Sequence, residues 1–161
     1  EPNQKIKHNR ATKDMAFRLY GINKWINENQ IDLVLHIHFN DYPRKNMDKA
    51  GEYSGFSIYI PEKQFKNSKK SHEFAETLKE KLEQNFKPSN LQAEEDIIIE
   101  SQSLIAIGAN KTVDVPVNLI EYAYIYEESL QSELERKNTL EQMAEYTVDA
   151  LNNYFILEIS S

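Results

Sequence analysis

The stretch Asp32-Leu33-Val34-Leu35-His36-Ile37-His38-Phe39-Asn40-Asp41 decides how the rest of the chain is interpreted. Its apolar and β-favouring residues lead into two histidines, and the closing Asn-Asp pair is typical of a strand end. Both alternating sets before the histidines are apolar, which indicates a strand buried on both faces, as in the centre of an α/β sheet. His36 and His38 stand two residues apart, so their side chains share one face of this strand. Because open α/β sheets bind ligands at the carboxyl ends of their strands, the two histidines are candidates for a metal or proton-transfer site.

The composition bounds the class of protein. The chain has 161 residues, enough for one domain with a sizeable core. A formal net charge of −7 argues against a nucleic-acid-binding surface, because phosphate neutralisation needs a basic patch. No run of about eighteen apolar residues is present, so the sequence predicts no membrane span. The chain has no cysteine, which excludes thiolate zinc sites, so any metal must be held by His, Asp or Glu.

Helical and strand patterns alternate along the chain. Apolar residues at helical spacing predict helices over 12–28, 68–86 and 138–155. The expected helix starts are Thr12 or Asp14 for the first helix, a Ser71 cap for the second, and an Asn138–Glu141 capping pair for the third.

Strand patterns fill the intervals between these helices. The runs 55–60, 97–99, 104–107 and 113–121 are predicted strands, with Pro116 near the start of the last because proline cannot donate to a ladder. Residues 1–10 read as a loose lead-in, and Glu94 to Asp96 as a solvated acidic turn. The polar loop from Asp41 to Ser54 follows the histidine strand, where functional loops tend to lie.

Glu121 closes the apolar run of the last predicted strand. A glutamate at a strand end is more often a solvated or ion-paired residue than a functional one. It becomes a stronger candidate for a functional role only if another site residue faces it. Glu121 is therefore a candidate whose interest depends on what lies beside it.

Taken together, the order of these signals resembles the zinc-dependent N-acetylmuramoyl-L-alanine amidases of the Amidase_3 type. Ile37-His38-Phe39-Asn40 is similar to the Ser-Ile-His-Ala-Asn strand end of that family, and Pro116-Val117-Asn118-Leu119-Ile120-Glu121 to its Pro-x-x-Leu-hydrophobic-Glu strand end. Between them, Ser54-Gly55-Phe56 begins a small-Gly-hydrophobic strand. The resemblance covers roughly residues 12 to 156. It implies one α/β catalytic domain over residues 1–161, with a twisted, mainly parallel sheet and helices on both faces.

The resemblance also implies roles for individual residues. His38 matches a zinc-binding histidine of the family, Glu121 its catalytic glutamate, and Asn40 the asparagine that closes the first motif. The loop residues Tyr42 and Tyr53 are expected to bind the glycan or the stem peptide of peptidoglycan. The implied cofactor is Zn²⁺, and the implied location is extracellular, periplasmic or associated with the cell wall.

The chain departs from the family pattern in several places. The family's first zinc histidine, in an Asp-Pro-Gly-His-Gly type of turn, and a zinc-binding glutamate after it have no counterpart in this sequence. The N-terminal strand and the first metal-binding turn are therefore expected to be missing. His36 replaces the usual serine, and Tyr122-Ala123 replaces the usual Gly-Phe pair.

Three interpretations of the function follow. In the first, zinc activates water to cleave the amide between N-acetylmuramic acid and L-alanine, and Glu121 moves the proton from the water to the leaving amine, general acid–base catalysis worth on the order of 10² to 10⁴ in rate. In the second, His36 and His38 bind zinc together with Glu121 as third ligand. In the third, the metal shell is incomplete, and the domain is a cell-wall binding or interaction module.

Overall fold

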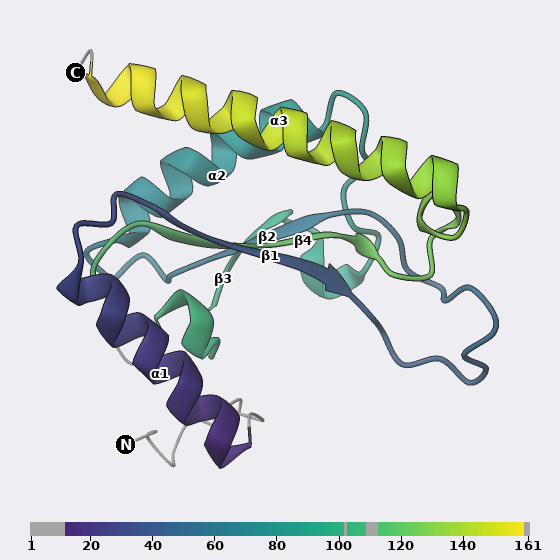
Figure 1. Cartoon of the computed structure of the whole chain (residues 1–161), viewed down its shortest axis with the longest axis horizontal. Helices are drawn as coiled ribbons and strands as arrows, with labels where there is room; N and C mark the ends of the chain where they lie inside the picture. Colours follow the sequence, from purple (N-terminus) through teal and green to yellow (C-terminus); the bar gives the residue numbers. More distant parts are fainter. Residues whose placement is uncertain (1–11, 102, 109–112, 160–161) are drawn as a thin grey trace.

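The fold is a mixed β-sheet with helices packed on both of its faces (Figure 1). The computed structural model describes residues 12–101, 103–108 and 113–159, so the predicted lead-in over residues 1–10 lies outside the described part. Helices are labelled α, single turns of 3₁₀ helix η, and strands β. In chain order the elements are α1 (Lys13–Glu28), β1 (Val34–Asn40), β2 (Ser57–Ile60), α2 (Ser68–Leu82), η1 (Gln92–Glu94), β3 (Ile98–Glu100), η2 (Ile105–Ile107), β4 (Val117–Tyr124), η4 (Glu128–Leu130) and α3 (Glu133–Ile159).

The strands of the described sheet lie in the order β1-β4-β2-β3. β1 runs parallel to β4, and β2 runs parallel to β3, whereas β2 and β4 are antiparallel. The predicted α/β class with a mainly parallel sheet is therefore confirmed. Its parallel pairs are joined through helical connections, as parallel strands require.

The prediction that the histidine strand is central was wrong, because β1 lies at the edge of the described sheet. Ile37 on this strand is 61% exposed, whereas Val117 and Ile120 on β4 are fully buried. Alternation along a strand reports which of its two faces is covered, not whether a neighbouring strand lies on each side. The prediction that this strand is buried on both faces was therefore wrong as well, because no residue of β1 is fully buried.

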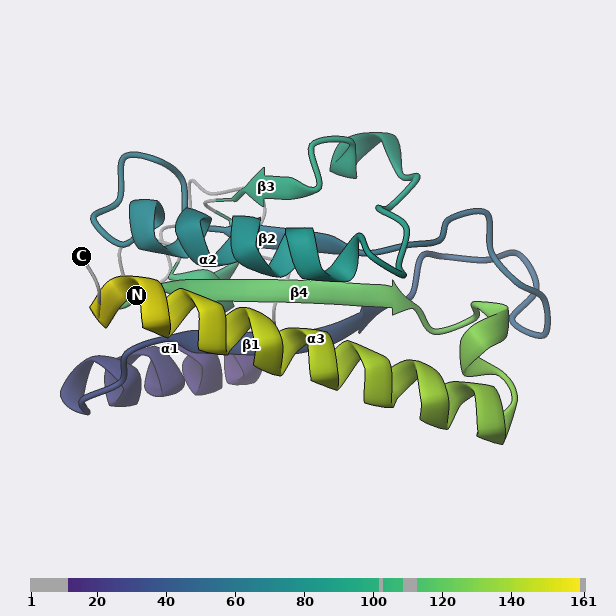
Figure 2. The same cartoon turned by 90° about the horizontal axis from the view of Figure 1, so that it is seen from above.

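Two helical layers enclose the sheet. α2 and α3 lie over one face, side by side in both views, and α1 covers the other (Figures 1 and 2). Under α2 and α3 the core contains Phe74, Leu78, Leu82, Ile120 and Tyr154. Under α1 a second cluster contains Ile26, Ile107, Val117 and Leu119. The periodic apolar stripes of the helices supply these contacts, as amphipathic helices do.

The helix starts were predicted correctly for α1 only. The Thr12 hydroxyl accepts a hydrogen bond from the Met15 backbone N–H at 3.3 Å, which is the expected N-cap. Ser71 does not cap α2, because it lies buried inside the helix, where its hydroxyl donates to the Asn67 carbonyl and accepts from the Val117 backbone N–H, at 2.8 and 2.9 Å. Ser71 thus fastens α2 to β4.

The last helix begins before the predicted Asn138–Glu141 pair, so that pair is not its cap. Ser132 accepts the backbone N–H of Glu135 at 3.2 Å and donates to the Glu135 carboxylate at 3.0 Å. The first of these bonds pairs one of the free backbone N–H groups at the helix start, as Ser/Thr/Asp caps generally do, and the second orients the Ser132 hydroxyl. α2 in turn ends at Leu82, short of the predicted end at Phe86.

Two further predictions were wrong. The run 104–107 forms η2, a 3₁₀ turn, and not a strand; its isoleucines at 105 and 107 are buried, and Gly108 ends it in the left-handed region with φ +92°. A short apolar run fits a buried turn as well as a strand. The acidic turn is not fully solvated either, because Glu94 is only 1% exposed. Across the described ranges, no helix has the length and apolarity needed to cross a membrane.

Candidate active site

The parallel register of β1 and β4 brings His38 and Glu121 together. His38 pairs with Glu121 in that register, near the carboxyl ends of both strands, so the two side chains emerge on the same face. His38 Nδ1 lies 3.7 Å from Glu121 Oε1. The two side chains therefore lie side by side, as the sequence predicts. Glu121 was a candidate only if another site residue faced it, and His38 does so.

These two side chains line a cavity of about 720 Å³ on the α1 side of the sheet. β1 contributes His36, His38 and Asn40, and β2 contributes Tyr59. Apolar residues of α1 and η2 form part of the remaining wall, so the polar groups stand in a largely apolar setting. A concave site with a few convergent polar groups is the usual form of a small-ligand or active site.

Glu121 is poised to titrate near neutral pH. Its side chain is 17% exposed, and its Oε2 atom is buried without a hydrogen-bond partner in the described part of the chain. Burial, and secondarily the charge of the nearby Glu94, raise the pKa of Glu121 to about 7. A carboxyl group in this range suits general acid–base catalysis, because it can take up and release a proton near working pH.

His36 is held as a neutral imidazole. Burial and the charge of His38 lower the pKa of His36 below its usual value, against a backbone hydrogen bond with Ala106. Its Nε2 atom is buried and has no hydrogen-bond partner among the described residues. The His36 and His38 ring centroids are 6.5 Å apart, with the ring planes at 83°. Neutral imidazole is the form of histidine that binds metals.

The donor types of the site fit zinc, but the described residues do not form a full ligand set. Imidazole nitrogen and carboxylate oxygen are both zinc ligands, and the partnerless Nε2 of His36 and Oε2 of Glu121 are free to accept one. Within the described ranges, however, no three His, Cys, Asp or Glu residues are grouped so that they could hold a metal ion. This does not support the interpretation in which His36, His38 and Glu121 chelate zinc as a triad.

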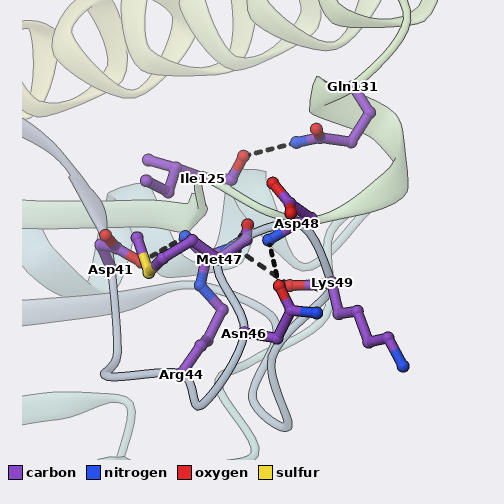
Figure 3. A network of polar contacts seen from close by, with 8 residues as sticks. All are labelled: Asp41, Arg44, Asn46, Met47, Asp48, Lys49, Ile125 and Gln131. Carbon is purple, nitrogen blue, oxygen red and sulfur yellow. Dashed lines mark hydrogen bonds and ion pairs between the residues drawn. The ribbon is translucent and has the colours of Figure 1, made fainter.

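The loop over residues 41–54 is organised around Arg44 (Figure 3). The guanidinium group donates to the Asp41 carboxylate and to the carbonyls of Met47 and Lys49, at 3.0 to 3.1 Å. It also lies 4.7 Å from the centre of the Tyr126 ring. An arginine with fixed partners on two sides gives this long loop a defined shape beside the carboxyl ends of the strands.

The structure separates the loop tyrosines from the histidine cavity. Tyr42 and Tyr53 contact one another edge to face, with ring centroids 4.6 Å apart. Tyr53 lines a second cavity, also of about 720 Å³, between the loop and the start of α3. Neither tyrosine lines the cavity of His38 and Glu121, whereas Asn40 does.

Sequence reasoning missed two residues near the site, Tyr59 and Glu94. Tyr59 lies two positions after Ser57, which pairs with Glu121, so strand alternation places it on the same face. That signal was available once β2 and β4 were known to be neighbours. Glu94 carried no comparable signal, because an acidic residue in a polar turn is normally exposed.

A comparison with known protein families identifies the family of this sequence. A sequence model of the family Amidase_3, N-acetylmuramoyl-L-alanine amidase, matches residues 4–153. No curated protein sequence matches the chain.

Several solved structures share the fold. Ami1 of Mycobacterium smegmatis, an N-acetylmuramyl-L-alanine amidase, superposes with a TM-score of 0.64 at 13% identity, over 84% of this chain and 59% of that one. The apo form of Ami1 from Mycobacterium abscessus gives 0.66 at 16% identity, over 85% and 61%. The CwlD amidase of Clostridioides difficile, solved in complex with the GerS lipoprotein, gives 0.62 at 17% identity, over 94% and 69%.

The chain thus spans about three fifths of the length of the two Ami1 structures. At these identities the structural likeness shows the fold alone. The family match covers nearly all of the sequence, and it includes the motifs that carry His38 and Glu121. On this match, the chain belongs to the N-acetylmuramoyl-L-alanine amidase family Amidase_3.

Proposed function

We propose that the chain is the catalytic part of a zinc-dependent peptidoglycan hydrolase that cleaves the amide between N-acetylmuramic acid and L-alanine. The observation that supports this most directly is the 3.7 Å approach of His38 to Glu121 in a largely apolar cavity. The substrate and the chemistry follow from membership of the family, and they imply a location at the cell wall.

The roles of the residues follow from their chemistry. His38 is the proposed zinc ligand on this chain, and the buried, neutral His36 is a second candidate donor. When bound, zinc supplies Lewis acidity, which polarises an amide carbonyl and lowers the pKa of water. Glu121, ionised above about pH 7, accepts a proton from the attacking water and delivers it to the nitrogen of the leaving L-alanine. The proton taken from water thus leaves on the amine, and the carboxyl group returns to its ionised state.

The cavity walls support the same proposal. Asn40 closes β1 beside His38, where its side-chain amide can donate to or accept from an amide substrate. Apolar residues of α1 and η2 lower the local dielectric, which strengthens the interactions of the charged groups. We keep Tyr42 and Tyr53 as proposed glycan or peptide contacts outside this cavity.

A second function is favoured by one specific observation. The absence of a group of three metal ligands from the described residues fits a cell-wall binding or interaction module that does not catalyse. This alternative predicts binding to peptidoglycan without any release of stem peptide.

One experiment separates the two functions. The purified chain, supplied with zinc, is incubated with peptidoglycan, and mass spectrometry detects free stem peptides with an N-terminal L-alanine. The amidase proposal predicts their release by the unmodified chain, loss of release in Glu121→Gln and His38→Ala, and unchanged release in the exposed control Glu145→Gln. Sedimentation with peptidoglycan without release supports the binding module instead.

A further inference from the structure

A buried carboxylate lies next to the proposed active site and has no role in the mechanism above. Glu94, in η1, is 1% exposed. Both of its oxygens accept hydrogen bonds from tyrosine hydroxyls: Oε1 from Tyr59 at 2.6 Å and Oε2 from Tyr124 at 3.3 Å. Since burying a carboxylate is costly, these two bonds are needed to hold it in place.

Tyr59 connects this buried carboxylate to the cavity. Its side chain lines the same cavity as His38 and Glu121. It pairs with Leu119 on β4, two residues before Glu121, and therefore shares the face from which Glu121 emerges. Burial, the hydrogen bond to Glu94, and the charges of Glu94 and Glu121 raise the pKa of Tyr59, so its hydroxyl stays protonated at neutral pH.

The bond to Glu94 fixes what the Tyr59 hydroxyl can do. A phenol has one hydrogen to donate, and in Tyr59 the Glu94 carboxylate takes that hydrogen bond. Toward any ligand in the cavity, the oxygen of Tyr59 is therefore an acceptor only. It selects for a ligand that offers an N–H or O–H donor at this place.

We propose that the Tyr59 hydroxyl accepts a hydrogen bond from the N–H of the amide to be cleaved, and that Glu94 is a positioning residue that fixes this hydroxyl as an acceptor. The inference rests on the proposed amidase function and adds a substrate contact to it. An amide between a lactyl carboxyl and L-alanine carries one N–H on the scissile nitrogen, next to the carbonyl that is attacked. Tyr59 orients that nitrogen in the cavity that contains Glu121, the group proposed to protonate it.

Binding of two matched ligands tests this contact without depending on turnover. The ligands are N-acetylmuramoyl-L-alanine and its ester analogue, in which oxygen replaces the alanine nitrogen and removes the N–H. All proteins carry Glu121→Gln so that neither ligand is consumed, and dissociation constants are taken from shifts in ¹H–¹⁵N spectra. Tyr59→Phe is compared with the matched control Tyr146→Phe, whose hydroxyl contacts Asn85 and does not line this cavity.

The proposal predicts that Tyr59→Phe weakens binding of the amide more than binding of the ester, whereas loss of a purely structural tyrosine would weaken both equally. Tyr59→Phe weakens binding of the amide by about three- to tenfold, the value of one neutral hydrogen bond, and binding of the ester by less than about twofold. Glu94→Gln replaces one carboxylate oxygen with an NH2 group that can donate to Tyr59, so the Tyr59 hydroxyl is no longer held as an acceptor only. The ratio of the ester dissociation constant to the amide dissociation constant should then fall toward one. Tyr146→Phe changes neither constant.

Equal losses for both ligands in Tyr59→Phe, or no loss for either, overturn the proposal. If Glu94→Gln loses the dispersed spectrum of a folded protein, the Tyr59→Phe comparison alone decides. If the binding comparison shows no selective loss for the amide but the unmodified chain releases stem peptides, the Tyr59 contact is refuted and the amidase function is retained. If the chain neither releases stem peptides nor binds N-acetylmuramoyl-L-alanine, both fail together.

Discussion

Replacing Glu121 with Gln is expected to stabilise the metal-free protein at alkaline pH and to change it little near pH 5. The folded protein raises the pKa of this carboxyl from 4.5 to about 7. Its contribution to stability is therefore fully present below about pH 4.5, where the carboxyl is protonated in both states, and it is lost as the pH rises through about 7. Glutamine has no proton to lose, so the variant escapes this loss.

The magnitude follows from the shift. One pKa unit corresponds to about 1.36 kcal/mol, so ionised Glu121 costs the folded protein on the order of 3 kcal/mol at about pH 8. Near pH 5 the same relation leaves less than about 1 kcal/mol. His36, whose pKa is lowered, acts in the opposite sense: it destabilises the folded protein as the pH falls below its ordinary value of 6.5. That contribution is present in both proteins and cancels in their difference.

The assay is urea unfolding followed by circular dichroism, between about pH 5 and pH 8, with chelator present. The free energy of unfolding of Glu121→Gln minus that of the unmodified chain should grow with pH over this range. Glu145→Gln, on the exposed surface of α3, should show no such trend. A difference independent of pH, or an unmodified chain that is the more stable at pH 8, would refute the argument that Glu121 is ionised at a cost to stability.

Three other predictions concern the metal, the core and the loop. His38→Ala should lower zinc affinity by more than about tenfold in calorimetric titration, and His36→Ala by less; a larger loss at His36 would contradict the proposed roles. Ser71→Ala should lower the free energy of unfolding by about 1 to 3 kcal/mol, because it leaves the buried N–H of Val117 without an acceptor, and an unchanged urea midpoint would contradict this. Arg44→Ala should speed proteolytic cleavage within residues 41–54 with little effect on global unfolding, since Arg44 holds two carbonyls of that loop; an unchanged cleavage rate would show that the loop is held otherwise.

The pairing of His38 with Glu121 was predicted from the family resemblance, which matches both residues to strand motifs. Glu121 does not end its strand as expected, because β4 continues to Tyr124. Parallel strands present their carboxyl ends at one edge of a sheet, so polar residues near those ends meet when the strands are neighbours, as β1 and β4 are. The confirmed α/β class follows from the same alternation of helical and strand patterns.

Other parts of the structure depended on contacts that no local pattern reports. Glu94 reads as a surface acid, and only the tyrosines of β2 and β4 reveal why it is buried. The edge position of β1 depends on which strands lie beside it, which alternation does not report. The start of α3, by contrast, was readable: Ser132 followed three residues later by Glu135 is a capping signature that precedes the helix.

Burial of Glu121 lowers the stability of the folded protein when the carboxyl group is ionised, and the proposed catalytic role explains why such a group is present in the site. A carboxyl that destabilises the folded chain when it is ionised is suited to taking a proton near neutral pH. Active sites commonly trade stability for such a group. The apolar contacts of α2 and α3 on the other face of the sheet help to offset that cost.

The central claim is that His38 and Glu121 form one end of a zinc site, and anomalous diffraction from zinc-soaked crystals tests it most directly. Data collected on either side of the zinc absorption edge locate the metal independently of activity. The account predicts a peak on the imidazole of His38, in the cavity that Glu121 enters. A peak only at surface groups such as the exposed pair His72 and Glu76, with none at His38, would contradict it.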